Sequence, residues 1–298
     1  MKILNIGSLN LDYVYQVDHI VAPGETEAGK TRSIFPGGKG LNQSVALARA
    51  GAEVYHCGLI GSDGQFLLEI CRENGVKTEY IHTIDGPSGH AVIQVDRTAQ
   101  NSILLFGGAN RCFTEAVVDE ALSGCGKGDV LLLQNEINLL PYIVDRASEK
   151  GLRVVLNPSP FDETLREVDL GKVGMFLLNE VEGEQLTGVA KPEEILRELR
   201  RRFPQADIVL TLGRDGACYA GREGNFYQPA FPVEAVDTTA AGDTFTGYFL
   251  AAVTEGKTIP EALRLGARAS SAAVTKAGAI PSVPWRQQVE ELEKNEKE

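Results

Sequence analysis

The residues with the clearest chemical potential lie at positions 236–247, VDTTAAGDTFTG. Apolar residues continue from Phe245 at helical spacing, which predicts a helix that begins near Gly242. Unpaired N–H groups at a helix start can bind an anion, and small residues let a phosphate approach the backbone. Asp243 would point into the same space, where a carboxylate can accept the proton of an attacking hydroxyl. Asp is also common at helix starts, so this segment alone leaves catalysis and helix capping equally open.

A second candidate is the glycine-rich run at residues 36–43, PGGKGLNQ, which leads into another predicted helix. Three glycines around Lys39 provide close backbone approach, N–H donors and one cation at a helix start. A two-residue hairpin needs much less glycine, so the pattern favours ligand binding over a simple turn.

Polar residues also follow several predicted strands. Ligands of open α/β sheets bind at the carboxyl ends of strands, where Asn10, Asp12 and Glu136 fall. An amide and a carboxylate can bind adjacent sugar hydroxyls, although a polar turn is the simpler explanation of this stretch alone. In residues 179–182, NEVE, the second Glu could hold Mg²⁺ through water, or the segment could simply begin a helix. Residues 211–216, TLGRDG, suit nucleotide contact or a hairpin.

Residues 24–31, GETEAGKT, match the P-loop pattern, but their surroundings argue against that function. The P-loop needs a buried strand before it and a helix that starts at its lysine. Here Pro23 precedes the motif, and Pro36 would end any helix after one turn. Glu25 and Glu27 would also repel phosphates. We interpret the match as a coincidence.

An alternation of short β-rich runs and helical patterns must position these residues. Strands are predicted at 3–6, 53–59, 130–134, 153–156, 175–178 and 208–211, with a hairpin at 217–220 and 226–229. Helices are predicted at 41–50, 65–73, 139–150 and 193–202. The alternation predicts an α/β fold built of βαβ units, with a mostly parallel sheet covered on both faces.

Two regions break this alternation. Strands are predicted at about 11–17, 30–36, 90–96 and 102–106, with no helix between the members of each pair. Together they predict a small, discontinuous sheet inserted into a single domain of residues 1–298. An isolated sheet of this size exposes one face, so it must pack on something. We expect it to form a lid over an active site, a dimer contact, or both.

Composition excludes several function classes. The net charge of −12 argues against binding to nucleic acid or to an anionic membrane surface. No apolar run approaches the ~20 residues that span a bilayer, and the N-terminus is too quickly interrupted by polar residues for a signal peptide. Five scattered cysteines without C-x-x-C spacing fit a reducing compartment. We expect a cytoplasmic protein.

The order of these motifs resembles the ribokinase family of sugar kinases, over essentially the whole chain from Gly7 to Trp285. The most specific parts are the two glycine-containing motifs and residues 278–285, GAIPSVPW. Residues 107–110 (GGAN) and 157–160 (NPSP) resemble the members that phosphorylate ribose. The resemblance implies a three-layer α/β fold with a mostly parallel central sheet and a small inserted β-sheet lid.

The resemblance also implies an activity, the ATP-dependent phosphorylation of D-ribose at O5 to D-ribose 5-phosphate. Asp243 would be the catalytic base. The anion hole beside it would be formed by Ala240, Ala241 and Gly242. The sugar would be bound by Asn10, Asp12, Gly38, Lys39, Asn42, Glu136 and Asp243. The ATP side would be lined by Asn179, Thr211, Gly213, Gly216 and Gly242. Glu182 would organise Mg²⁺ through water.

Members of this type also bind a monovalent cation, K⁺, beside the anion hole. The resemblance places it near the side chains of Asp237 and Ser282. Carbonyl ligands would come from Thr239, Ala273, Lys276 and Gly278. Thr239 stands where an apolar residue is common, but a carbonyl ligand does not depend on the side chain. The lid would also form the contact of a homodimer.

Two alternatives stay open. A related kinase of another pentose, deoxyribose or a nucleoside would keep Asp243 and differ in its sugar contacts. The adjacent Asn10 and Asp12 favour a substrate with neighbouring free hydroxyls. A non-catalytic, sugar-responsive regulator should have lost Asp243 or gained a partner-binding domain, and the sequence shows neither.

Overall fold

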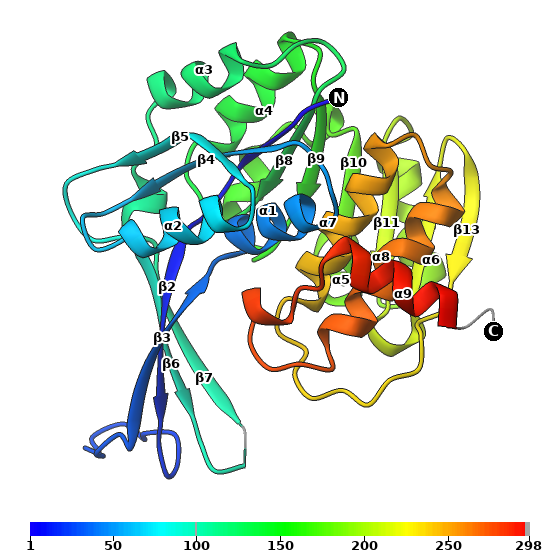
Figure 1. The fold of residues 1–298 in the computed structure, drawn as a ribbon. Coiled ribbons are helices and arrows are strands. Elements are labelled where there is room, and N and C mark those ends of the chain that lie inside the picture. The colour runs from blue at the N-terminus through cyan, green and yellow to red at the C-terminus, as the bar shows by residue number, and fades with distance from the viewer. Residues whose placement is uncertain (99, 296–298) are drawn as a thin grey trace.

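A nine-stranded sheet forms the centre of the computed structural model, which describes residues 1–98 and 100–295 (Figure 1). The strand order is β13-β12-β11-β10-β9-β8-β1-β4-β5. The strands are β1 (Ile3–Ile6), β4 (Val54–Ile60), β5 (Lys77–Thr83), β8 (Val130–Gln134), β9 (Arg153–Asn157), β10 (Met175–Asn179), β11 (Asp207–Thr211), β12 (Ala217–Gly221) and β13 (Gly224–Gln228). The pairings are parallel from β5 to β11 and antiparallel from β11 to β13. The predicted mostly parallel sheet is confirmed.

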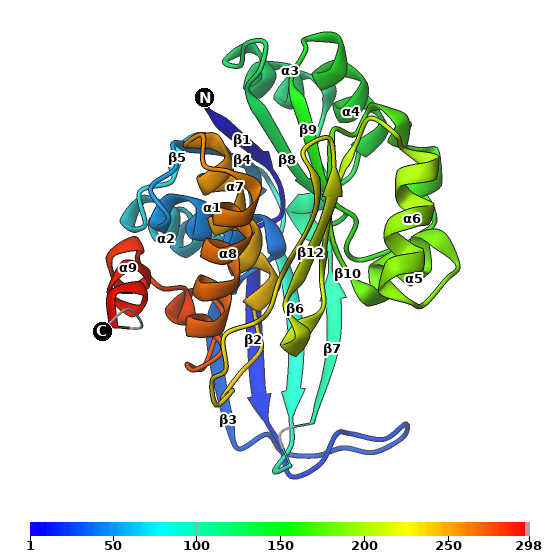
Figure 2. The same ribbon diagram turned by 90° about the vertical axis from the view of Figure 1, so that its right-hand side faces the viewer.

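The helices cover both faces of this sheet (Figure 2). They are α1 (Lys39–Arg49), α2 (Gln65–Glu73), α3 (Glu115–Ser123), α4 (Leu140–Glu149), α5 (Glu180–Thr187), α6 (Pro192–Arg202), α7 (Ala241–Thr254), α8 (Ile259–Ala273) and α9 (Arg286–Asn295). One layer contains α1, α2, α7, α8 and α9, and the other contains α3 to α6. In β8, Val130 and Leu132 face the first layer, whereas Leu131 and Leu133 face the second. Burial on both faces explains why these strands are continuous apolar runs.

The central position of β1 determines where a site can form. It lies between β4 and β8, with Ile3 opposite both Val54 and Val130. The chain continues from β1 toward one edge through β4 and later toward the other edge through β8. Ligands of doubly wound sheets bind at such a switch point, outside the carboxyl ends of the strands.

A second, four-stranded sheet projects from the main body (Figures 1 and 2). Its order is β3-β2-β6-β7, from β2 (Asn10–Gln16), β3 (Thr31–Gly37), β6 (Gly89–Val95) and β7 (Asn101–Phe106). These bounds confirm the inserted sheet to within two residues. Residues 24–30 contain no helix and Thr31 begins a strand, so the rejection of the P-loop is also confirmed.

Both faces of the small sheet carry exposed apolar side chains, because successive side chains of a strand point to opposite faces. They are Ile34, Phe35, Ile103, Leu104, Leu105 and Phe106. Within residues 1–98 and 100–295, no helix combines the length and apolar character that crossing a bilayer would require.

Candidate active site

Asp243 lies in the first turn of α7, as the sequence predicts. The helix is entered through Ala240, whose φ of 58° is left-handed and rare for a residue with a side chain. The first i→i−4 bond runs from Thr244 N–H to Ala240 C=O (2.8 Å), so the N–H groups of Gly242 and Asp243 precede the helical ladder. A Cβ added at Gly242 would meet no atom within 4 Å. The helix start therefore faces open space that a phosphate could occupy.

Two side chains of α1 hold the Asp243 carboxylate. Asn42 Nδ2 donates to Oδ2 (3.0 Å), and Gln43 Nε2 donates to Oδ1 (2.8 Å). Asp243 is only 8 % exposed. The two glycine-containing motifs, about 200 residues apart in the chain, thus meet at one buried carboxylate.

The glycine loop before α1 owes its shape to close backbone contacts. Gly38 has a φ of 92°, and a Cβ there would lie 2.9 Å from Ser8 Oγ. At Gly40 a Cβ would lie 2.4 Å from Ser8 N. Only glycine lets this loop lie against the end of β1.

A cavity beside the start of α7 collects most of the residues predicted for the ATP side. Its polar lining includes Lys39, Asn157, Asn179, Glu182, Thr211, Thr238, Asp243 and Thr246, and Ala240, Ala241 and Gly242 also line it. Gly213 and Gly216 are not part of this lining. They shape the turn after β11, with φ values of 53° and 102°.

Asn179 and Glu182 begin α5 with a capping box. Asn179 Oδ1 accepts from Glu182 N–H (2.9 Å), and Glu182 Oε2 accepts from Asn179 N–H (3.0 Å). The helix-start alternative is therefore correct for both residues. It leaves them in the cavity lining, so capping and ligand binding are compatible.

A smaller cavity contains two of the residues predicted to bind the sugar, Asn10 and Glu136. It is lined by Asn10, Leu105, Gly107, Asn110, Arg111 and Glu136. Asn10 Oδ1 accepts from Asn110 Nδ2 (2.7 Å), which fixes the Asn10 amide. Asn110 was not predicted as a site residue, although the motif at residues 107–110 was a signal for it.

Asp12 and Glu136 both lie against the glycine loop. A Cβ added at Gly37 would lie 2.1 Å from Asp12 Oδ2, so this carboxylate fits only over a glycine. Glu136 Oε2 accepts from Lys39 N–H (2.9 Å) and from the Ser8 hydroxyl. Ser8 was not predicted as a site residue, and its one signal is its position directly after β1.

Burial dominates the electrostatics of this region. It raises the pKa of Asp12 to about 7, with a further contribution from Glu136. Burial also raises the pKa of Glu136, against the opposing effect of Ser8 and Lys39. Burial alone would lower the pKa of Lys39, but the carboxylates of Asp243, Glu136 and Glu182 outweigh it and raise that pKa. The charge of Lys39 thus interacts favourably with three carboxylates.

The predicted cation residues lie on two adjoining segments. Asp237 Oδ1 accepts from Thr239 N–H (2.9 Å), and Oδ2 accepts from Gly278 N–H (2.8 Å). Burial raises the pKa of Asp237, but these hydrogen bonds outweigh it and hold the pKa below its usual range. Ser282 is buried and donates to Ala279 C=O (2.8 Å).

Asp237 therefore joins residues 237–239 to the loop before Ser282. Among the described residues, no three His, Cys, Asp or Glu side chains form a metal site. A cation between these segments would depend on carbonyl oxygens, as the predicted set from Thr239, Ala273, Lys276 and Gly278 requires.

Comparison with known proteins now decides the family. The model of the pfkB family of carbohydrate kinases matches residues 1–286. The chain belongs to this family. It is 38 % identical over 296 residues to a ribokinase of Haemophilus influenzae, and the match covers 96 % of each chain.

Solved structures agree with this membership. A ribokinase structure from Thermotoga maritima has a TM-score of 0.89 at 32 % identity, covering 99 % of this chain and 100 % of the other. The Arabidopsis thaliana ribokinase complexed with ribose and ATP has a TM-score of 0.86 at 30 % identity, covering 98 % of each chain. The predicted family and its three-layer fold with an inserted β-sheet are confirmed.

Proposed function

We propose that this kinase transfers the γ-phosphoryl group of ATP to O5 of D-ribose, giving D-ribose 5-phosphate and ADP. One observation carries the proposal: the buried Asp243 carboxylate stands in the same turn as a helix start that opens into a cavity. A carboxylate beside an anion site suits hydroxyl activation. The ribokinase relatives support ribose as the sugar.

Asp243 acts as the general base. It takes the proton of the sugar hydroxyl as that oxygen attacks the γ-phosphorus in line, and ADP leaves. Asn42 and Gln43 hold the carboxylate while this happens. The N–H groups of Ala240, Gly242 and Asp243 stabilise the charge that develops on the transferred oxygens, whereas the Ala241 N–H already donates to Thr238 C=O (3.2 Å).

Asn42 has a second role in sugar binding. No described residue donates to its buried Oδ1, which can therefore accept from a sugar hydroxyl. The other groups proposed to bind the sugar are Asn10, Asp12, Gly38, Lys39 and Glu136.

ATP binds in the larger cavity, against the β10 and β11 ends. Its contacts are proposed to come from Asn179, Thr211, Gly213, Gly216 and Gly242. Mg²⁺ fits beside Glu182 through water, because phosphates supply most of its ligands in such sites. When bound, it neutralises phosphate charge. K⁺ is proposed at the carbonyls near Asp237 and Ser282, where it would stabilise the anion hole.

The inserted sheet is proposed to act as a lid of a single kinase domain, residues 1–298. Leu105 on β7 already lines the smaller cavity. Lid closure would exclude water, which otherwise competes with the sugar hydroxyl for ATP. The exposed apolar side chains Ile34, Leu104 and Phe106, which lie on the face of the lid opposite to Leu105, support a homodimer contact with a second copy. The five free cysteines and the use of ATP support a cytoplasmic location.

The test is a coupled ADP-release assay over ribose, deoxyribose, other pentoses and nucleosides, run in KCl and in NaCl. We expect the highest kcat/KM with ribose, faster turnover in KCl, no turnover with EDTA, and a product phosphorylated at O5 by ³¹P NMR. Higher kcat/KM with deoxyribose or a nucleoside would reassign the substrate. Ribose binding without any ADP release would favour the regulator.

A further inference from the structure

A chain of buried amides continues behind the Asp243 carboxylate. Gln43 donates to Asp243 through Nε2 and accepts at Oε1 from Gln134 Nε2 (2.7 Å). Both glutamines are fully buried, with 0 % exposure. Neither belongs to the lining of the two cavities described above. Gln43 contacts the proposed base and Gln134 contacts Gln43, and neither lines the space of a substrate.

The chain extends across the carboxyl ends of the central strands. Gln134 Nε2 also donates to Asn5 Oδ1 (3.1 Å), and Asn5 Nδ2 donates to Ser44 Oγ and to Gly40 C=O (both 2.8 Å). Ser44 Oγ lies 2.8 Å from Nδ1 of the buried His56, whose pKa burial lowers to about 4. His56 is therefore neutral near pH 7, and its Nδ1 can accept a hydrogen bond from the Ser44 hydroxyl.

A backbone carbonyl sets the direction of every amide in this relay. Gly40 C=O can only accept, so the Asn5 NH₂ group must face it and the Asn5 oxygen faces Gln134. That oxygen requires the NH₂ group of Gln134, which in turn faces the oxygen of Gln43. The NH₂ group of Gln43 is thereby left to face Asp243. A flipped Gln43 would present an oxygen to a carboxylate, which is repulsive.

We propose that Gln43 is a positioning residue for Asp243, held in a single amide orientation by the relay of Gln134 and Asn5. This inference rests on the proposed role of Asp243. Two donors on different carboxylate oxygens fix both the rotation and the place of the group, whereas Asn42 alone would fix one oxygen. Gln134 Oε1 and Nε2 of the adjoining His56 have no hydrogen-bond partner among the described residues, so the orientation of the relay depends on the contacts of the Gln134 and Asn5 NH₂ groups.

The test removes the relay without touching either substrate cavity. Gln43→Met keeps the length of the side chain and removes the amide. We expect kcat to fall about 10- to 100-fold, because small displacements of a catalytic group cost that much, with the KM values for ribose and ATP within about twofold. Gln134→Met should lower kcat less, since Gln43 keeps its donor and loses only its orientation. The double variant should match Gln43→Met alone, because Gln134 acts through Gln43.

Asn74→Leu is the matched control for loss of a buried amide. Asn74 accepts from Arg49 Nε (2.8 Å), donates to Ile70 C=O (2.8 Å) and lines neither cavity. This variant should lower the melting temperature and leave kcat unchanged. If Gln43→Met fails to fold, the kcat of Gln134→Met relative to the unmodified protein tests the proposal.

Asp243→Asn, measured in parallel, separates the two proposals. Near-normal turnover by Asp243→Asn overturns the base assignment itself. Loss of activity in Asp243→Asn with unchanged kcat in Gln43→Met and Gln134→Met overturns only the positioning role. Equal kcat losses in Asn74→Leu and Gln43→Met would also overturn it, because the effect would then be one of general stability.

Discussion

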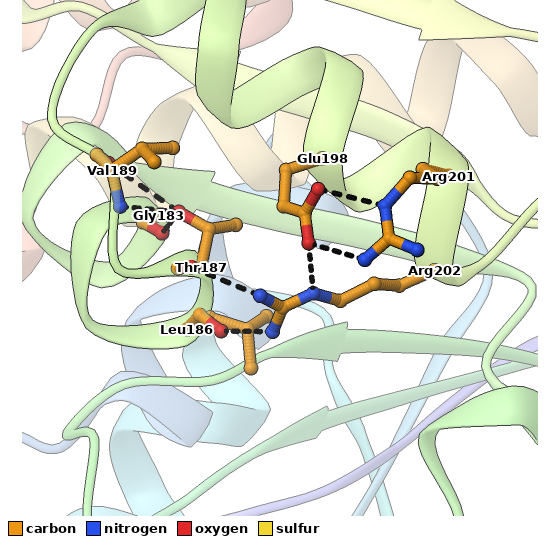
Figure 3. A network of polar contacts seen from close by, with 7 residues as sticks. All are labelled: Gly183, Leu186, Thr187, Val189, Glu198, Arg201 and Arg202. Carbon is orange, nitrogen blue, oxygen red and sulfur yellow. Dashed lines mark hydrogen bonds and ion pairs between the residues drawn. The ribbon is translucent and has the colours of Figure 1, made fainter.

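Two polar clusters in this molecule use similar groups in opposite surroundings. On α6, Glu198 accepts from Arg201 and Arg202, and Arg202 also donates to the carbonyls of Leu186 and Thr187 at the end of α5 (Figure 3). These side chains are partly to largely exposed. The Asp243 relay has a comparable set of bonds, but it is buried.

Burial decides what each cluster can do. The two arginines lower the pKa of Glu198 to about 2, yet water can replace any bond that this carboxylate loses. The Asp243 relay has no such substitute, so a lost donor leaves a buried polar group unsatisfied. The surface cluster therefore braces two helices, whereas the buried relay can hold one group at a defined place.

The largest expected effect comes from replacing the carboxylate of the buried relay by an amide of the same shape, with the same replacement in the surface cluster as its control. Asp243→Asn removes the proposed base and should lower kcat about 10²- to 10⁴-fold, with ribose binding retained. Glu198→Gln should leave kcat and KM unchanged. Steady-state kinetics of both variants, with ribose binding by calorimetry, check this. A kcat loss in Glu198→Gln similar to that in Asp243→Asn would abolish the distinction between the clusters.

The next effect concerns the open space at the start of α7. Gly242→Ala adds a methyl group that meets no atom within 4 Å, so the protein should fold with an unchanged melting temperature. The methyl group would occupy phosphate space, and we expect kcat/KM for ATP to fall about 100-fold. Gly126→Ala is the control, because its Cβ would meet only Asp129 at 3.9 Å. Normal kinetics in Gly242→Ala would show that no phosphate binds at this turn.

The surface cluster and the buried relay also differ in how far sequence can predict them. Glu198 pairs with residues three and four positions later, a spacing visible in any helix. Asn5, Gln43 and Gln134 are isolated polar residues from three separate elements. Their contact depends on how α1, β1 and β8 pack, and one sequence does not define that packing. The relay was therefore not predicted, although Asp243 was.

The same reasoning explains which parts of the fold could be predicted from the sequence. The buried parallel strands are apolar runs, so they were predicted almost residue by residue. The edge strand β5 contains Lys77, Glu79 and His82, and it was not predicted, because an edge strand needs no apolar run. Motif residues such as Gly38 and Gly40 were recognisable because backbone geometry restricts their type.

A smaller effect tests Asp12, a partly buried carboxylate outside the relay. Since the pKa of Asp12 is raised to about 7, its charge is lost as pH falls. If the carboxylate accepts from sugar hydroxyls, ribose should bind about tenfold more weakly at about pH 5.5 than at about pH 8. Calorimetric titrations over this range check it, and Asp12→Asn should bind weakly at every pH. A pH-independent affinity in the unmodified protein would contradict the role of Asp12.

The raised pKa of Asp12 also predicts how Asp12→Asn changes the folding stability at each pH. A raised carboxyl pKa means that folding stability is lost as pH rises from the usual value of 3.8 through about 7. Asp12→Asn should therefore raise the melting temperature at about pH 8, with the gain shrinking toward pH 4. Asp96 is the control, because hydrogen bonds from Thr98 and Gln100 lower its pKa. Asp96→Asn should lower the melting temperature at about pH 8.

The smallest effect is expected at the surface cluster itself. Arg202→Met removes the donors to Leu186 and Thr187, so the melting temperature should fall by no more than ~3 °C. Arg201→Met should lower it less, because Arg201 contacts Glu198 but, in the described structure, neither carbonyl. Neither variant should change kcat or KM. A raised KM for ATP in Arg202→Met would mean that α5 transmits the loss from its end to Asn179 and Glu182 at its start, and that the exposed cluster also positions the site.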